Sequence, residues 1–220
     1  MRATDASLDV VGLHSRVAAI YDAWTWFTET KSLHAALERA RIQDGEAVLE
    51  VAVGTGIAFR EILKRNPSGR NVGIDLTASM LRRARQRAER IGVPHELLVA
   101  DARSLSFEDK SFDVVVNNNM LGLLPQADLA PILSEMSRVL RPGGRLVIVT
   151  MMRPATRFAD WIYRVGAVWL GGWRAVDIEP LVGDAGFESV SREVVMQLGI
   201  PSEVLIARKA GSSPGCNFTG

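Results

Sequence analysis

The feature that most constrains this sequence is an alternation, between residues 47 and 150, of short apolar runs with longer amphipathic stretches. Runs such as residues 47–51 and 112–116 are typical of strands that are buried on both faces of a parallel sheet. The stretches between them repeat their apolar residues at three- and four-residue steps, as a helix does. The sequence therefore predicts βαβ units and an α/β fold with a doubly wound, Rossmann-like and mostly parallel sheet.

Turn residues set the expected boundaries of these elements. Asp44-Gly45 ends one helix, Thr77 or Ser79 caps another, and Gly92 supplies its C-terminal stop. The parallel strands are expected at residues 47–51, 71–75, 96–99, 112–116 and 145–150, helices at about 129–140 and 177–186, and a C-terminal antiparallel strand pair at 187–196 and 203–209.

No internal repeat and no long linker interrupts the chain, so we expect a single domain over residues 1–210. Within it, residues 1–43 are expected to form a helical cap, and residues 151–176 an insertion. The small, polar residues 211–220 predict a flexible tail.

Composition excludes several classes of partner. The 26 basic residues balance 25 acidic ones, which gives no reason to expect a nucleic acid partner. One cysteine and three scattered histidines lack the spacing of a metal site, so no metal is expected. No run reaches the ~20 apolar residues of a membrane helix, and the N-terminus lacks a secretory pattern, which predicts a cytoplasmic protein. Peripheral membrane contact through the tryptophan-rich residues 161–173 and the oligomeric state both stay open.

Candidate ligand-binding residues follow the strands, because ligands of such sheets bind beyond the carboxyl ends. The turn Gly54-Thr55-Gly56 allows a ligand to approach the backbone at a helix start. Phe59 stands where a nicotinamide dinucleotide site has a small residue, which argues against that cofactor. Glu50 is costly to bury unpaired, so it orients the turn or receives a ligand ammonium, unless it is a solvated strand end.

Two aspartates end the next strands. Asp75 lies about 20 residues beyond the glycine turn, where a carboxylate can accept hydrogen bonds from ribose hydroxyls; the alternative is a cap on the following helix. Asp101 can accept from an exocyclic amine of adenine, or it can be a turn aspartate that binds its own backbone.

Together these positions resemble the class I S-adenosylmethionine-dependent methyltransferases, most closely those of ubiquinone and menaquinone biosynthesis (methyltransferase type 11). Four passages carry the resemblance, which covers about residues 15–210: VLEVAVGTG (48–56), GIDLTASML (73–81), Asp101-Ala102 with FDVVVN (112–117), and LRPGGRL (140–146). One departure is Ala52, which stands where the family's first glycine usually lies; alanine is small enough for a slightly adjusted loop.

The resemblance implies S-adenosyl-L-methionine as the cofactor and names the residues that would bind it. Gly54, Thr55 and Gly56 would cradle it, Asp75 would hold the ribose, and Leu76 would pack on the base. Asp101 and Ala102 would contact adenine, and Asn117 would meet the methionine portion. The remaining cofactor-binding positions are Glu50, Ala52, Met80 and Tyr21, the last of which is equally well explained as a core aromatic.

The resemblance implies that the N-terminal helices and the segment after the fifth strand form the substrate pocket, which places the insertion at 151–176 on the substrate side. Both segments are rich in aromatic residues, so the expected reaction is methyl transfer to a small hydrophobic or aromatic, quinone-like acceptor. The alternatives are a phospholipid N-methyltransferase, an NAD(P)-dependent oxidoreductase and a non-catalytic nucleotide-binding protein. No histidine falls on a matched motif, so no general base is assigned. The arginines of residues 82–90 are expected to form a solvated helix face.

Overall fold

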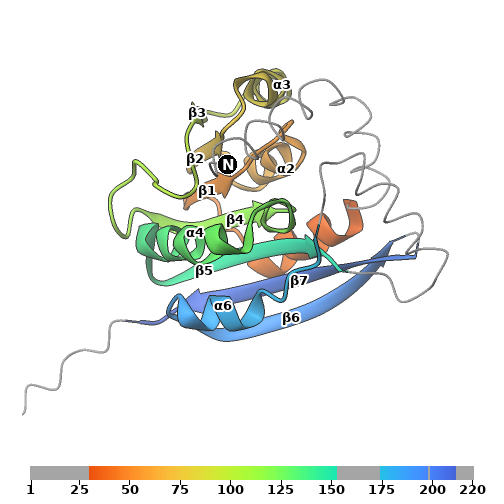
Figure 1. Cartoon of the computed structure of the whole chain (residues 1–220). Helices are drawn as coiled ribbons and strands as arrows, with labels where there is room; N and C mark the ends of the chain where they lie inside the picture. The colour runs from red at the N-terminus through yellow and green to blue at the C-terminus, as the bar shows by residue number, and fades with distance from the viewer. Residues whose placement is uncertain (1–29, 153–173, 198, 212–220) are drawn as a thin grey trace, which may run out of the picture.

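The computed structural model describes residues 30–152, 174–197 and 199–211 (Figure 1). Its centre is a seven-stranded sheet in the order β3-β2-β1-β4-β5-β7-β6. The strands are β1 (Ala47–Val51), β2 (Arg70–Asp75), β3 (Glu96–Val99), β4 (Phe112–Asn118), β5 (Leu140–Met151), β6 (Phe187–Gln197) and β7 (Ile200–Lys209). The first five are parallel, and β7 runs antiparallel between β5 and β6. The predicted α/β fold with a C-terminal antiparallel pair is confirmed.

Helices cover both faces of this sheet. They are a helix over residues 30–40, α2 (Ile57–Arg65), α3 (Ala78–Glu89), the 3-10 turn η1 (Leu121–Leu123), α4 (Gln126–Val139) and α6 (Glu179–Asp184). Figure 1 shows α4 and α6 in front of the sheet and the helix over residues 30–40 behind it. The helix over residues 30–40 packs with α2, and α3 packs against α2 and β2.

The two helical layers explain the continuous apolar runs of the inner strands. Val115 packs towards α4, whereas Val114 and Val116 pack towards the helix over residues 30–40, and none of the three is exposed. Adjacent side chains of a strand point to opposite faces, so a strand covered on both sides has no polar face.

The structure corrects several boundary predictions, among them the start of β7, which lies at Ile200 and not at residue 203. β5 begins at Leu140, not at residue 145, because Leu140 pairs with Phe112 before the register shifts. Thr77 occupies the N-cap position of α3 but makes no side-chain cap bond; its backbone N–H instead donates to Asp75. Most of the expected N-terminal cap and most of the insertion at 151–176 lie outside the described residues, as does nearly all of the tail.

Within the described ranges, no helix combines the length and apolar character that crossing a bilayer requires. The same residues contain no cluster of three or more histidine, cysteine or acidic side chains with which to bind a metal.

Candidate functional site

The candidate site lies at the carboxyl edge of the sheet, where the chain reverses its direction of winding. β2 and β3 follow β1 on one side, and β4 and β5 lie on its other side. The loops that leave β1 and β4 therefore diverge, which is the position where ligands bind in open α/β sheets. Six of the predicted site residues lie on β1, the turn that follows it and the end of β2, and Asn117 lies beside them on β4.

The turn after β1 uses three left-handed backbone conformations. Ala52, Gly54 and Gly56 have φ angles of 62°, 55° and 84°. A Cβ on Gly56 would lie 2.7 Å from the Cα of Ala84, so this glycine allows α3 to pack closely. A Cβ on Gly54 would meet no atom within 4 Å, so the space above this residue is open to a ligand.

Asp75 joins the glycine turn to the start of α3. Its Oδ2 accepts a hydrogen bond from the backbone N–H of Gly54 at 2.8 Å, and its Oδ1 accepts one from Thr77 at 2.8 Å. The predicted connection to α3 is therefore present through the backbone of Thr77. Beside it, the side chain of Leu76 is 48% exposed, whereas Met80 is buried. An exposed leucine next to a held carboxylate suits the base and sugar of a nucleoside.

Glu50 is buried beneath the turn and is 1% exposed, which excludes the solvated strand end. Its Oε2 has no hydrogen-bond partner. Burial, and secondly the nearby negative charge of Asp75, raise the pKa of Glu50 well above its usual value. A buried carboxyl with an unused oxygen is a group that a bound ligand can satisfy.

Glu50→Gln is expected to stabilise the ligand-free protein by an amount that grows with pH. Because the pKa of Glu50 is raised in the folded state, folding loses stability as pH rises from the unfolded value of about 4.5 through the folded one. Glutamine carries no charge and avoids that loss. Thermal unfolding at pH 5 and pH 8 measures the difference, with the exposed Glu108→Gln as control; an equal effect at both pH values contradicts the assignment.

Asn117 connects β4 to β1. Its side chain is fully buried, and its Nδ2 donates to the carbonyl of Val51 at 2.9 Å. Its Oδ1 has no hydrogen-bond partner. The amide is therefore fixed at the strand edge with one acceptor unused, next to the end of β1.

Asp101 adopts the turn arrangement that the sequence left as its alternative. Its Oδ1 accepts from the backbone N–H of Arg103 at 2.9 Å, and the Arg103 guanidinium donates to both carboxylate oxygens. These bonds lower the pKa of Asp101. Ala102 follows it with partial exposure. A contact of Asp101 and Ala102 with adenine stays a prediction.

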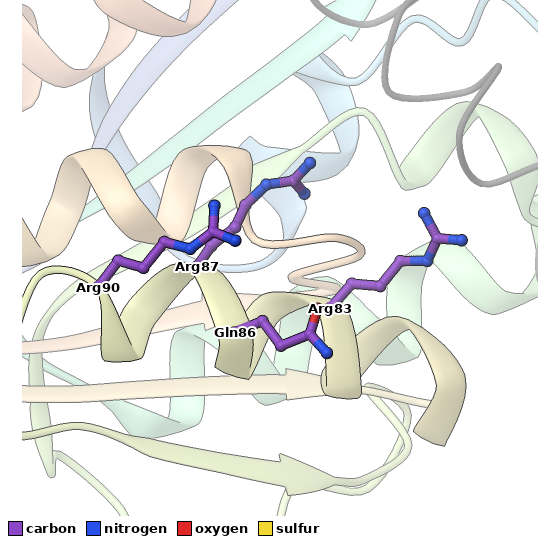
Figure 2. Close-up of a pocket in the computed structure, with 4 residues that line it drawn as sticks. All are labelled: Arg83, Gln86, Arg87 and Arg90. Carbon is purple, nitrogen blue, oxygen red and sulfur yellow. The ribbon is translucent and has the colours of Figure 1, made fainter.

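Sequence reasoning missed Arg87, which donates to the carbonyl of Thr55 at 2.5 Å and so connects α3 to the glycine turn. Thr55 itself is buried. Arg87 also helps to line a cavity of about 140 Å³ with Arg83 and Gln86 of α3 and with Arg90, the C-cap residue of that helix (Figure 2). This cavity is polar and open, in agreement with a solvated helix face.

Two other expectations concern aromatic residues and histidines. Tyr21 lies outside the described residues. His95 packs edge-on against Phe59, and its Nδ1 lies 2.7 Å from the carbonyl of Val93, so this ring has a structural role; His34 is exposed on the helix over residues 30–40. Neither described histidine belongs to the site.

Known proteins resemble this chain in sequence and in fold. A family model for a methyltransferase domain matches residues 48–144. The chain is 37% identical over 158 residues to the ubiquinone/menaquinone biosynthesis C-methyltransferase of Bordetella avium, which covers 70% of this chain and 58% of that protein. It is 41% identical over 107 residues to a phosphatidylethanolamine N-methyltransferase of Cereibacter sphaeroides, covering 48% and 50% of the two chains.

Among solved structures, phosphoethanolamine N-methyltransferase 2 of Haemonchus contortus, in complex with S-adenosyl-L-methionine, superposes with a TM-score of 0.68 at 17% identity. The match covers 82% of this chain and 53% of that one. The chain spans about three fifths of the length of the ubiquinone/menaquinone-type relatives that it matches.

These relatives give no support to the oxidoreductase alternative, and Phe59 is buried between α2 and α3, where it replaces the small residue of a dinucleotide turn. The strand order, the open glycine turn and the residues matched by the family model all agree with a methyltransferase domain. The chain therefore carries a methyltransferase domain over residues 48–144, and it resembles the class I S-adenosylmethionine-dependent methyltransferases in sequence and in fold.

Proposed function

We propose that this protein transfers a methyl group from S-adenosyl-L-methionine to a small hydrophobic or aromatic acceptor of the quinone type. The observation that carries the proposal is the open space above Gly54, whose backbone N–H donates to the Asp75 carboxylate, with the exposed Leu76 next to Asp75 in the chain. A bare backbone, an anionic hydrogen-bond acceptor and an apolar surface are the three contacts that an adenosyl group needs.

The residues present fit this cofactor. The backbone of Gly54, Thr55 and Gly56 would cradle it, Asp75 would accept hydrogen bonds from the ribose hydroxyls, and Leu76 would pack on the adenine. The unused oxygens of Glu50 and Asn117 lie on the neighbouring strand ends β1 and β4, where they would receive the ammonium and the methionine portion. The further assigned positions are Ala52, Met80, Asp101, Ala102 and Tyr21.

The cofactor supplies a methyl group that is already activated on a sulfonium. The protein's own residues then have to align the acceptor with that methyl and exclude water, and alignment alone lowers a barrier by several kcal/mol. Asp75 contributes to alignment because it fixes both the glycine turn and the start of α3.

The acceptor class is inferred from the relatives. Several ubiquinone and menaquinone methyltransferases match about 61–70% of this chain, whereas the phosphatidylethanolamine enzyme matches 48% of it. A quinone-like acceptor is therefore the first candidate, and a phospholipid amine is the second. The tryptophan-rich residues 161–173, for which peripheral membrane contact stays open, lie outside the described residues.

Two experiments test the proposal. Calorimetry is expected to show binding of S-adenosylhomocysteine and none of NAD. Methyl transfer from labelled cofactor is then measured with a demethylmenaquinol and with phosphatidylethanolamine in detergent micelles. Label in the quinol supports the first candidate and label in the lipid the second. Cofactor binding without transfer to either acceptor contradicts the proposed activity.

A further inference from the structure

Two polar side chains face each other in the interior of the antiparallel part of the sheet. Thr150 of β5 is paired in register with Glu203 of β7. Both are buried, at 1% and 2% exposure. They lie near the carboxyl end of β5, beside the end of β4, because the backbone N–H of Asn119 donates to the carbonyl of Val149 at 2.8 Å.

These two residues interrupt apolar rows. On β5, Leu146 and Ile148 face the core that contains α4 and α6, and on β7, Leu205 and Ala207 do the same. Side chains alternate along a strand, so Thr150 and Glu203 continue these rows on the same face. A hydroxyl and a carboxyl thus stand where packing alone favours apolar side chains, which is the pattern of a functional site.

The charges around Glu203 come from three described elements. Arg192 of β6 forms an ion pair with Glu203 and a second one, at 3.4 Å, with Glu179 of α6. Asp177, which precedes α6, and Glu179 add negative charge. Burial is the main cause that raises the pKa of Glu203, and Arg192 opposes it. A carboxyl in this setting takes up a proton more readily than an exposed one does.

The hydroxyl of Thr150 supplies a second observation. Its Oγ1 is buried and has no hydrogen-bond partner. Buried hydroxyls are nearly always bonded, because an unused one costs free energy. An isosteric valine fits the same β-strand position without that cost. The Thr150 hydroxyl, unbonded beside the carboxyl of Glu203, is therefore available to a further polar group.

We propose that Glu203 accepts the proton that the methyl acceptor loses, and that Thr150 hydrogen-bonds the same hydroxyl or amine of that acceptor. This inference rests on the proposed function. Adjacent strands lie 4.7–4.9 Å apart, so β7 is about 10 Å from β4, a span that an aromatic acceptor bridges. The acceptor's reactive atom would then face the end of β4, and its proton-bearing group would face β7.

The step balances as follows for a quinol. The ring hydroxyl gives its proton to Glu203, and the ring carbon forms a bond to the methyl carbon. The bond between that methyl carbon and sulfur breaks, and its electron pair stays on sulfur, which gives a neutral thioether. The ring carbon then loses its hydrogen as a proton, the ring oxygen regains one, and Glu203 releases its proton to solvent. One proton is released in each turnover.

Glu203→Gln tests the role of the carboxylate. Glutamine has the same size but accepts no proton, so kcat is expected to fall roughly 100-fold, within the usual range for a lost general base. The affinity for S-adenosylhomocysteine is expected to stay unchanged, because Glu203 lies away from the glycine turn. In the wild-type protein kcat should rise with pH as Glu203 deprotonates. This rise, the acid limb of the pH–rate profile, should disappear in the variant.

Thr150→Val separates function from folding. Removing an unbonded hydroxyl is expected to leave the thermal unfolding temperature unchanged or higher, while KM for the acceptor rises about tenfold, as expected for one lost hydrogen bond. Ser202→Ala is the matched control. Ser202 is equally buried with an unbonded Oγ, and as the neighbour of Glu203 on β7 it points to the opposite face of the sheet. That variant should keep wild-type kinetics.

The probes are the demethylmenaquinol and phosphatidylethanolamine used for the wild-type protein. Wild-type kcat and an intact acid limb in Glu203→Gln would overturn the inference and leave the proposed function standing. Equal kinetic losses in Thr150→Val and Ser202→Ala would also overturn it, because both would then be packing effects. Absence of turnover by the wild-type protein with both acceptors contradicts the proposed function, and the inference with it.

Discussion

Gly54→Val is expected to abolish cofactor binding while the protein stays folded. A side chain on Gly54 would enter the space that the structure leaves open above the glycine turn, and it would meet no protein atom within 4 Å. The cofactor would lose that space. We expect the affinity for S-adenosylhomocysteine to fall about 100-fold or more, which corresponds to about 3 kcal/mol, measured by calorimetry.

The control for this variant is Gly92→Val. Gly92 also has a left-handed backbone, with φ of 73° against 55° for Gly54, and it also has open space around it. Both variants therefore carry a similar conformational cost, roughly 1–2 kcal/mol of unfolding free energy. Gly92 follows the C-terminal end of α3, away from the site. Similar stability but loss of binding only in Gly54→Val supports the assignment; retained affinity means that the turn is structural only.

Asp75→Ala is expected to weaken cofactor binding by ~1–3 kcal/mol, about 5- to 150-fold. Part of this loss comes from the ribose hydrogen bonds, and part comes from the hydrogen bonds that Asp75 accepts from the backbone of Gly54 and Thr77. Asp44→Ala controls for the loss of hydrogen bonds to the backbone. Asp44 accepts a backbone N–H from Ser68 at 2.7 Å in an exposed loop outside the site, so its loss should change stability and leave binding unaltered.

A cycle over protein and ligand isolates the ribose contact. S-adenosylhomocysteine and its 2′-deoxy analogue are titrated into the wild-type protein and into Asp75→Ala. If Asp75 holds the ribose, removal of the hydroxyl weakens binding to the wild type and has little further effect on the variant. An equal loss in both proteins would show that Asp75 only supports the turn.

The spacing of apolar residues along the chain and the positions of turn residues were sufficient to predict most of the fold. Strands buried on both faces have runs such as residues 47–51 that few other elements share, and glycine turns separate them from helices. The start of β5 was missed because Pro142, Gly143 and Gly144 are typical of a turn, whereas pairing with β4 keeps this segment extended. Tertiary pairing there overrides local preference.

The sequence predicted the site residues whose type and position after a strand point to one role. It was less informative for residues whose role depends on the side chains that they contact. Gly54 and Asp75 followed from their positions after strands, and the structure brings them within one hydrogen bond of each other. Asp101 was ambiguous because its partner, Arg103, lies two residues away and satisfies it locally. Arg87 and Glu203 were missed, since their contacts with Thr55 and Thr150 join segments far apart in the chain. A glutamate within the apolar run of β7 was the only sign in the sequence.

A crystal structure with S-adenosylhomocysteine tests the central claim most directly. The account predicts the ligand at the carboxyl edge of β1 and β2, with its ribose hydroxyls within hydrogen-bond distance of the Asp75 carboxylate and its chain above Gly54. A ligand bound elsewhere, or bound at this edge with no ribose hydroxyl within hydrogen-bond distance of the Asp75 carboxylate, would contradict it.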